Sequence, residues 1–138
     1  DVSTDAKIKY ADFLILSKKW KELETEALAI QKLDKVNPKV FKYLGYAYSE
    51  NGNPEGAIKS LTDYMTKVDA KKINGKDYLY LAKAKLATSM DDKGIVSNQT
   101  KFNEAISDLT KAAELNPNLN TELILKTHPH LLEKIQLL

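Results

Sequence analysis

Apolar residues recur at three- and four-residue spacing along most of this chain, and that spacing is the feature that most restricts its fold. Phe41, Leu44 and Tyr48 show the pattern clearly. Such spacing lines one face of a helix, whereas a half-buried strand requires strict alternation of apolar and polar residues. No segment shows that alternation, nor the turn signals of a β-hairpin. The sequence therefore predicts an all-α fold.

Turn signals divide the pattern into successive helices. Asn37-Pro38 and Asn116-Pro117 end two of them, because a residue that precedes proline is disfavoured in the helical region. Asn51-Gly52-Asn53 ends another, and Pro54 suits the first turn of the next helix. Met90 to Thr100 forms a longer, more polar connection. The expected helices contain residues 10–16, 20–33, 41–48, 54–68, 78–86 and 102–115.

Composition narrows the class of protein further. The chain has 138 residues, 43% of them hydrophobic and 29% charged, which is typical of one folded domain with a sizeable core. No apolar run reaches the roughly 18 residues of a membrane span. All 21 basic residues are lysine, with 19 carboxylates beside them. Without arginine, the usual bidentate ligand of phosphate and guanine, we do not expect nucleic-acid binding.

The helices form an internal repeat. Residues 4–37 and 38–71 align as units of about 34 residues, and a third unit at 75–119 carries an insertion of about 11 residues near 89–99. Large and small residues take matching positions in the three units. The matching residues are Tyr10, Ala11, Leu14 and Trp20; Phe41, Leu44, Gly45, Tyr48, Ala57 and Leu61; and Tyr78, Leu81, Ala82, Phe102, Ala105, Leu109, Ala112 and Pro117.

This pattern resembles that of tetratricopeptide repeats, over about residues 4 to 119. The resemblance implies a right-handed α-solenoid of about three helix–turn–helix pairs in one domain, 1–138, with capping helices or a further repeat at 120–138. We expect the matching residues to form the core. Lys85 departs from the pattern, because it stands where an aromatic residue is usual.

Gly45 lowers the helix propensity of its own segment by up to about 1 kcal/mol relative to alanine. Small residues where two helices cross allow their backbones to approach closely. We therefore expect Gly45 to contact the neighbouring helix near Ala57, with Gly45→Leu destabilising and Gly45→Ala tolerated.

Members of this family usually bind a peptide or a partner protein in a concave groove lined by the first helix of each pair. The resemblance thus implies a protein-binding scaffold, with Asp12, Tyr46 and Lys83 in one row. Ile8, Asp12, Tyr46, Leu79 and Lys83 also occupy the places where some members carry a carboxylate clamp, and the clamp is not present. The implied groove residues are Asp5, Ile8, Asp12, Ile15, Lys39, Lys42, Tyr46, Ser49, Lys76, Leu79, Lys83 and Leu86.

Nothing in the sequence predicts catalysis, a metal site or a cofactor. There is no cysteine, no Gly-rich phosphate loop, and both histidines lie in the HPH sequence at 128–130 without a third ligand. Asp91, Asp92 and Gly94 lack the alternation and closing glutamate of a calcium loop. Asn98-Gln99-Thr100 matches a glycosylation triplet, which we interpret as chance.

The end of the chain suggests a second function. Four apolar residues at helical spacing, Leu131, Leu132, Ile135 and Leu138, would fold back on the third repeat, join further repeats, or pair with another chain. The alternative to a binding groove is therefore a segment of a longer array that self-associates through this stripe. Abundant lysine and asparagine indicate a bacterial source, and the absence of cysteine and of an initial methionine favours the cell envelope.

Overall fold

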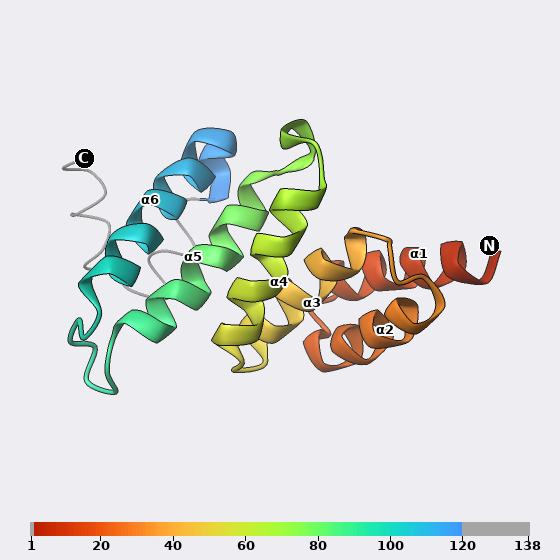
Figure 1. The fold of residues 1–138 in the computed structure, drawn as a ribbon, viewed down its shortest axis with the longest axis horizontal. Coiled ribbons are helices and arrows are strands. Elements are labelled where there is room, and N and C mark those ends of the chain that lie inside the picture. The colour runs from red at the N-terminus through yellow and green to blue at the C-terminus, as the bar shows by residue number, and fades with distance from the viewer. Residues whose placement is uncertain (1, 120–138) are drawn as a thin grey trace. The chain divides into compact units, whose positions relative to one another are not determined.

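The computed structural model describes residues 2–119, with side chains from Thr4 onward (Figure 1). This part of the chain consists of helices and loops, without a strand, which confirms the all-α prediction. The predicted capping segment 120–138, the stripe Leu131, Leu132, Ile135 and Leu138, and the two histidines lie outside the described residues. The elements are α1 (Val2–Leu16), α2 (Trp20–Leu33), α3 (Lys39–Glu50), α4 (Pro54–Lys67), η1 (Ala70–Lys72), α5 (Gly75–Ser89), α6 (Gln99–Leu115) and η2 (Pro117–Leu119).

Asparagine side chains begin several of these helices. The Asn53 side chain accepts a hydrogen bond from Gly56 N at 3.0 Å, directly before Pro54. Asn74 and Asp77 form a reciprocal capping box at α5, in which each side chain accepts from the other residue's backbone N–H. These bonds satisfy N–H groups that have no partner within the helix. Local sequence therefore fixes where α4 and α5 start.

α2 ends at Leu33, the last residue of the expected range 20–33, before Asn37-Pro38. Asp34 follows it, and its side chain accepts the N–H of Val36 at 3.3 Å, which offers the backbone a turn in place of a further helical residue.

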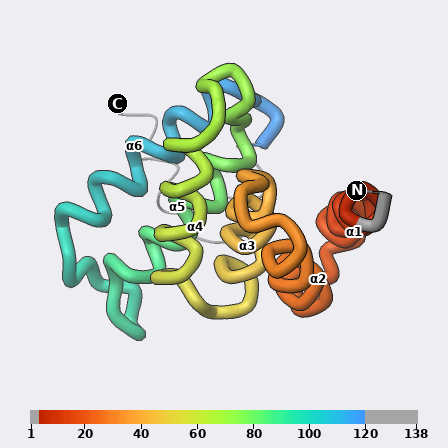
Figure 2. The backbone as a smooth tube through the Cα atoms, turned by 45° about the vertical axis from the view of Figure 1, so that its right-hand side comes forward, coloured from red at the N-terminus to blue at the C-terminus, as the bar shows by residue number. Residues whose placement is uncertain are grey.

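The chain divides into two compact units, 1–70 and 71–138. The first two predicted repeats, 4–37 and 38–71, fall essentially within unit 1, and the third, 75–119, falls within unit 2. In unit 1 each helix packs on the next, α1 on α2, α2 on α3 and α3 on α4, as Figure 2 shows from a second side.

Gly45 in α3 lies against Leu61 in α4 within unit 1. A Cβ atom added at Gly45 would lie 2.4 Å from Leu61 Cγ, and Leu61 is fully buried. The expected close contact between the two helices is present, with Leu61 as the closest side chain. The structure argues against the expectation that Gly45→Ala would be tolerated, because an alanine methyl group would overlap with Leu61 unless that side chain shifts.

Unit 2 is built on the antiparallel pair α5 and α6, whose buried side chains form one cluster. Leu119 of η2 packs against the edge of this cluster. Between the helices, Met90 and Val96 form an isolated antiparallel bridge around a turn at Gly94, which has φ of +78°. The cluster consists of Leu79, Ala82, Leu86, Phe102, Ala105, Ile106, Leu109 and Ala112.

Candidate functional site

The predicted groove residues lie on three helices that belong to different units. Those of α1 and α3 are in unit 1, and Lys76, Leu79, Lys83 and Leu86 are on α5 in unit 2. Within unit 1 the α1 and α3 residues that stay at least partly exposed form what we call the first-helix surface. Its members are Asp5, Ile8, Asp12, Ile15, Lys39, Lys42 and Ser49.

Three of the predicted groove residues are buried in this structure. Tyr46 is 1% exposed, Leu79 is 6% exposed and Leu86 is 4% exposed. Leu79 and Leu86 belong to the core between α5 and α6. Tyr46 lies on α3, which is packed on both α2 and α4 and buries five consecutive residues from 43 to 47. The expected row of Asp12, Tyr46 and Lys83 therefore has no exposed aromatic side chain.

Asp12 takes part in a contact between α1 and α3. The hydroxyl of Tyr43 donates a hydrogen bond to Asp12 Oδ1 at 2.7 Å. Burial, followed by the nearby carboxylate, raises the pKa of Tyr43 well above its ordinary value, so the phenol stays protonated and can donate. This bond holds the first helices of the two predicted repeats together in unit 1.

Large apolar side chains are exposed on α1 and α2. One of them is Tyr10, which we expected to lie in the core. Tyr10 is 46% exposed and Phe13 is 56% exposed, and their rings stack with centroids 6.5 Å apart. On α2, Leu28 is 38% exposed and Leu33 is 55% exposed. We call Tyr10, Phe13, Leu28 and Leu33 the α1–α2 patch.

Two hollows lie beside Tyr10, Leu28 and Leu33 of this patch and share Thr25. Tyr10 lines the first, of about 340 Å³, together with Lys21, Glu22, Thr25 and Glu26 of α2. Thr25 also lines the second, of about 560 Å³, which contains Leu28 and Leu33. The two hollows therefore follow α2 along most of its length. The remaining residues of the second hollow are Lys7, Ala29 and Lys32.

Charged groups of both signs border these hollows. Lys7 Nζ of α1 lies 3.4 Å from Glu26 Oε1 of α2 and forms an ion pair across them. Lys21, Lys32 and Glu22 are exposed. An apolar surface with a polar border of this kind is typical of protein-interaction sites rather than of sites for small charged ligands.

Lys85, the residue that departs from the repeat pattern, forms an ion pair in unit 2. Its Nζ lies 2.9 Å from Asp108 Oδ2 of α6, with both side chains largely buried. Among the described residues that oxygen has no well-directed hydrogen bond, so the contact is mainly electrostatic. Burial raises the pKa of Asp108, and the attraction of Lys85 partly opposes this. The pair stands between two packed helices, where we expect a structural role.

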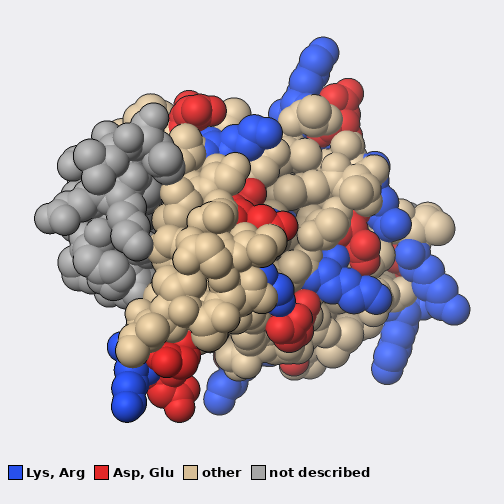
Figure 3. Space-filling view, turned by 60° about the vertical axis from the view of Figure 1, so that its left-hand side comes forward, with Lys and Arg blue, Asp and Glu red and all other residues tan. Residues whose placement is uncertain are grey.

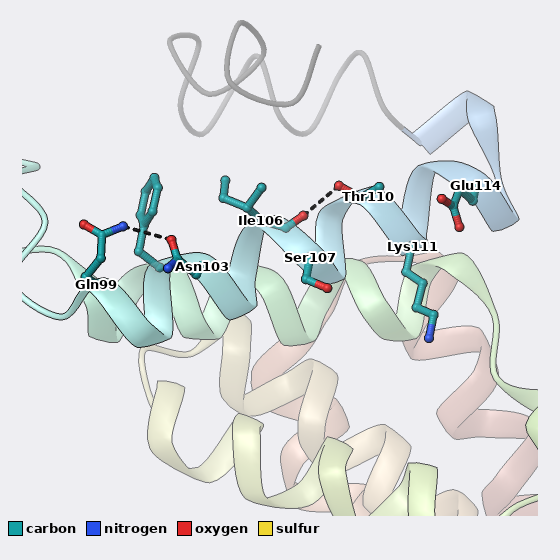
Figure 4. Close-up of a pocket in the computed structure, with 8 residues that line it drawn as sticks. Gln99, Asn103, Ile106, Ser107, Thr110, Lys111 and Glu114 are labelled. Atoms are coloured by element: carbon teal, nitrogen blue, oxygen red, sulfur yellow. Dashed lines mark hydrogen bonds between the residues drawn. The ribbon is translucent and has the colours of Figure 1, made fainter. Parts of the chain in front are cut away.

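A hollow in unit 2 runs along α6 and has a volume of about 670 Å³. In Figure 4 its lining residues follow one another along this helix. The Gln99 side chain donates to Asn103 Oδ1 at 2.9 Å, and the Thr110 hydroxyl donates to the Ile106 carbonyl at 2.9 Å. The lining residues are Gln99, Phe102, Asn103, Ile106, Ser107, Thr110, Lys111 and Glu114.

Residues 4–119 contain no group of three or more side chains placed to hold a metal ion. In the loop at 91–95, Asp91 bonds to the backbone. Its Oδ1 accepts hydrogen bonds from the N–H groups of Lys93 and Ile95, both at 2.9 Å. This carboxylate thus shapes the turn at Gly94. Asn98 of the glycosylation triplet caps α6 by accepting from Lys101 N at 3.1 Å.

Lysine and carboxylate side chains are interspersed on the face of the molecule shown in Figure 3. None of the helices in the described part of the chain has the length and apolar character needed to cross a bilayer. The sequence matches no protein-family model, and no curated protein matches it. The resemblance to tetratricopeptide repeats therefore rests on the residue pattern alone.

Proposed function

We propose that this chain is a non-catalytic protein-binding module built from tetratricopeptide-like helix pairs. The small residues of the repeat pattern support the proposal, since Ala11, Gly45, Ala57, Ala82 and Ala105 are all buried. The sequential packing of four helices in unit 1 and the α5–α6 pair in unit 2 also fit such pairs. In this proposal the pairs stack as a right-handed solenoid.

The exposed α1–α2 patch is the observation that carries the binding function. Tyr10 and Phe13 expose about half of their surface beside two connected hollows. Large apolar side chains that cluster at a protein surface mark interaction sites, whereas scattered ones do not. Aromatic residues also provide much of the binding energy in protein interfaces.

The partner that fits this surface is an amphipathic helix. The hollows follow α2, whose 14 residues extend for about 21 Å, so a helix of similar length would cover both of them. Its apolar face would contact Tyr10, Leu28 and Leu33, and its flanking charges would meet Lys21, Lys32 and Glu22. Binding of a helix in a groove by apolar anchors at helical spacing is a common mode of peptide recognition.

The first-helix surface is the binding site that the family resemblance implies, and it is the second candidate within unit 1. Ile8 and Ile15 are partly exposed there, between Asp5 and Asp12 on α1 and Lys39 on α3. The Asp12 carboxylate already accepts a hydrogen bond from Tyr43, so it is less available to a partner than we expected.

Selection from a displayed library of helical peptides, followed by affinity measurement, tests the proposal. Phe13→Glu places a charge in the patch and should weaken a selected peptide by about tenfold or more, which is at least 1.4 kcal/mol. Ile95→Glu is the matched control, because Ile95 is 61% exposed and lies in the loop of unit 2. Ile8→Glu distinguishes the first-helix surface. Equal affinity of Phe13→Glu and wild type would show that the patch is not the binding site.

Self-association is the alternative function. The stripe expected to carry it, Leu131, Leu132, Ile135 and Leu138, lies outside the described residues, and within them the exposed α1–α2 patch is a surface that a second copy could cover. Light scattering of the purified chain separates the two functions. A monomer at micromolar concentration contradicts self-association, whereas a dimer that Phe13→Glu converts to a monomer supports it.

A further inference from the structure

The hollow along α6 differs in chemistry between its two ends. Toward the start of the helix it is lined by Phe102 and Ile106, with the uncharged Asn103 between them. Toward the end it is lined by Thr110, Lys111 and Glu114. A helix that lay antiparallel to α6 in this hollow would therefore place its second half against the apolar end.

The hollow has the length of one helix. It extends from Gln99 to Glu114, almost the whole of α6, whose 17 residues span about 25 Å. Small polar side chains at positions 103 and 107 leave room for another backbone to approach, as at other helix crossings.

The chain leaves α6 at the polar end of the hollow. The N–H of Asn116 bonds to the Ala112 carbonyl at 2.9 Å, and Leu119 N–H bonds to the Asn116 carbonyl at 3.1 Å, so η2 turns directly after the helix. Leu119 then packs against the core of unit 2, where its Cδ1 would lie 2.9 Å from a Cβ at Gly75. This contact fixes the point from which residues 120–138 continue.

We propose that residues 120–138 of the same chain fill this hollow and run antiparallel to α6. As a helix this segment would extend for roughly 28 Å, enough to return along the whole of α6. A turn at η2 places Leu131 and Leu132 level with about residue 105, beside Phe102 and Ile106. The same register places Lys126 level with about residue 110, near Glu114.

The second half of the segment matches the apolar end of the hollow, because it contains Leu131, Leu132 and Ile135. Lys126, Thr127 and His128 precede this half, and Leu123, Ile124 and Leu125 lie nearer the start of the segment. Pro129 interrupts backbone hydrogen bonding and permits a kink between these parts. Because the segment is tethered beside the hollow, its effective concentration there is in the millimolar range, which a separate partner would have to overcome.

The absence of cysteine allows a direct test with the full-length chain, because one introduced cysteine can be labelled alone. A nitroxide spin label at Glu133→Cys should broaden the backbone amide NMR signals of residues 99–107. A label at Lys126→Cys should instead broaden those of residues 107–114. The two labels together report both the contact and its direction.

Substitution and mixing experiments decide whether the contact is specific and within one chain. With the label at 133, Ile135→Asp should abolish the broadening, whereas the matched variant Gln136→Asp should retain it. Mixing spin-labelled, isotopically unlabelled chain with ¹⁵N-labelled, unmodified chain should produce no broadening. Broadening in the mixture would mean that a second copy fills the hollow. If the α6 signals of the spin-labelled chain itself are not broadened, the segment lies elsewhere. Either result overturns the proposal.

Discussion

Gly45 on α3 and Leu61 on α4 are in direct contact, and a Cβ atom at Gly45 would lie only 2.4 Å from Leu61 Cγ and 2.7 Å from its Cδ2. Leu61 is fully buried, so it cannot move aside into solvent. Glycine therefore avoids an overlap at this crossing, even though it lowers the helix propensity of α3.

Gly45→Ala should lower the free energy of unfolding by about 1 kcal/mol, because overpacking costs about 1–3 kcal/mol and the gain in helix propensity offsets up to about 1 kcal/mol. Gly45→Leu should cost more. Urea unfolding of Gly45→Ala, Leu61→Ala and the double variant provides the test. In the Leu61→Ala background, Gly45→Ala should be neutral or stabilising, and strictly additive effects would contradict the contact.

The Lys85–Asp108 pair predicts that a double substitution is better tolerated than a single one. Lys85→Met should lower stability by about 1–3 kcal/mol, because it leaves the largely buried Asp108 without its cation. Lys85→Met with Asp108→Leu should recover most of this loss, as apolar replacements of buried ion pairs often do. Thermal unfolding of both variants checks the prediction, which fails if the double variant is less stable than Lys85→Met.

The raised pKa of Asp108 predicts how stability depends on pH. Folding disfavours the charged carboxylate, so the native state holds this proton at a higher pH than the unfolded chain does. Relative to Asp108→Asn, which cannot titrate, the wild type should gain stability as the pH falls from the raised pKa toward the ordinary value of 3.8. Chemical unfolding of both proteins across this range measures the difference. A difference that grows as the pH rises would mean that Lys85 outweighs burial.

The bond between Tyr43 and Asp12 predicts a specific loss in α1. Tyr43→Phe should lower the free energy of unfolding by about 1 kcal/mol, because it removes one hydrogen bond between α1 and α3. Hydrogen exchange of α1 amides should accelerate more than that of α4 amides. Tyr10→Phe is the control and should have no effect, since Tyr10 is 46% exposed. Unchanged exchange in α1 would show that the bond does not hold this helix.

Helix existence and most helix ends were predictable, because local chemistry decides them. Asn53 and Pro54 start α4 by capping and by a fixed backbone angle, and both signals are readable in the sequence. α2 ends at Leu33, the last apolar residue of its pattern, and Asp34 forms a side-chain turn there ahead of Asn37-Pro38. Lys85 departs from the repeat pattern, and its partner Asp108 lies on a different helix, which no local pattern could indicate.

The accessible surface was harder to predict than the helices, because periodicity does not say which face of a helix is covered. α1 is apolar on two sides, and the chain buries Ala11 and Leu14 while exposing Tyr10 and Phe13. Exposure was likewise expected for Tyr46, which the packing of α3 on two neighbours buries. The α1–α2 patch was therefore visible only once the helices were in place.

NMR chemical-shift mapping of the chain with a selected helical peptide tests the proposed binding function most directly. We predict that the largest shifts occur at Tyr10, Thr25, Leu28 and Leu33, which line the two hollows, and at Phe13, whose ring stacks on that of Tyr10. Shifts confined to α5 and α6, or to the first-helix surface, would contradict the assignment of the α1–α2 patch as the binding site.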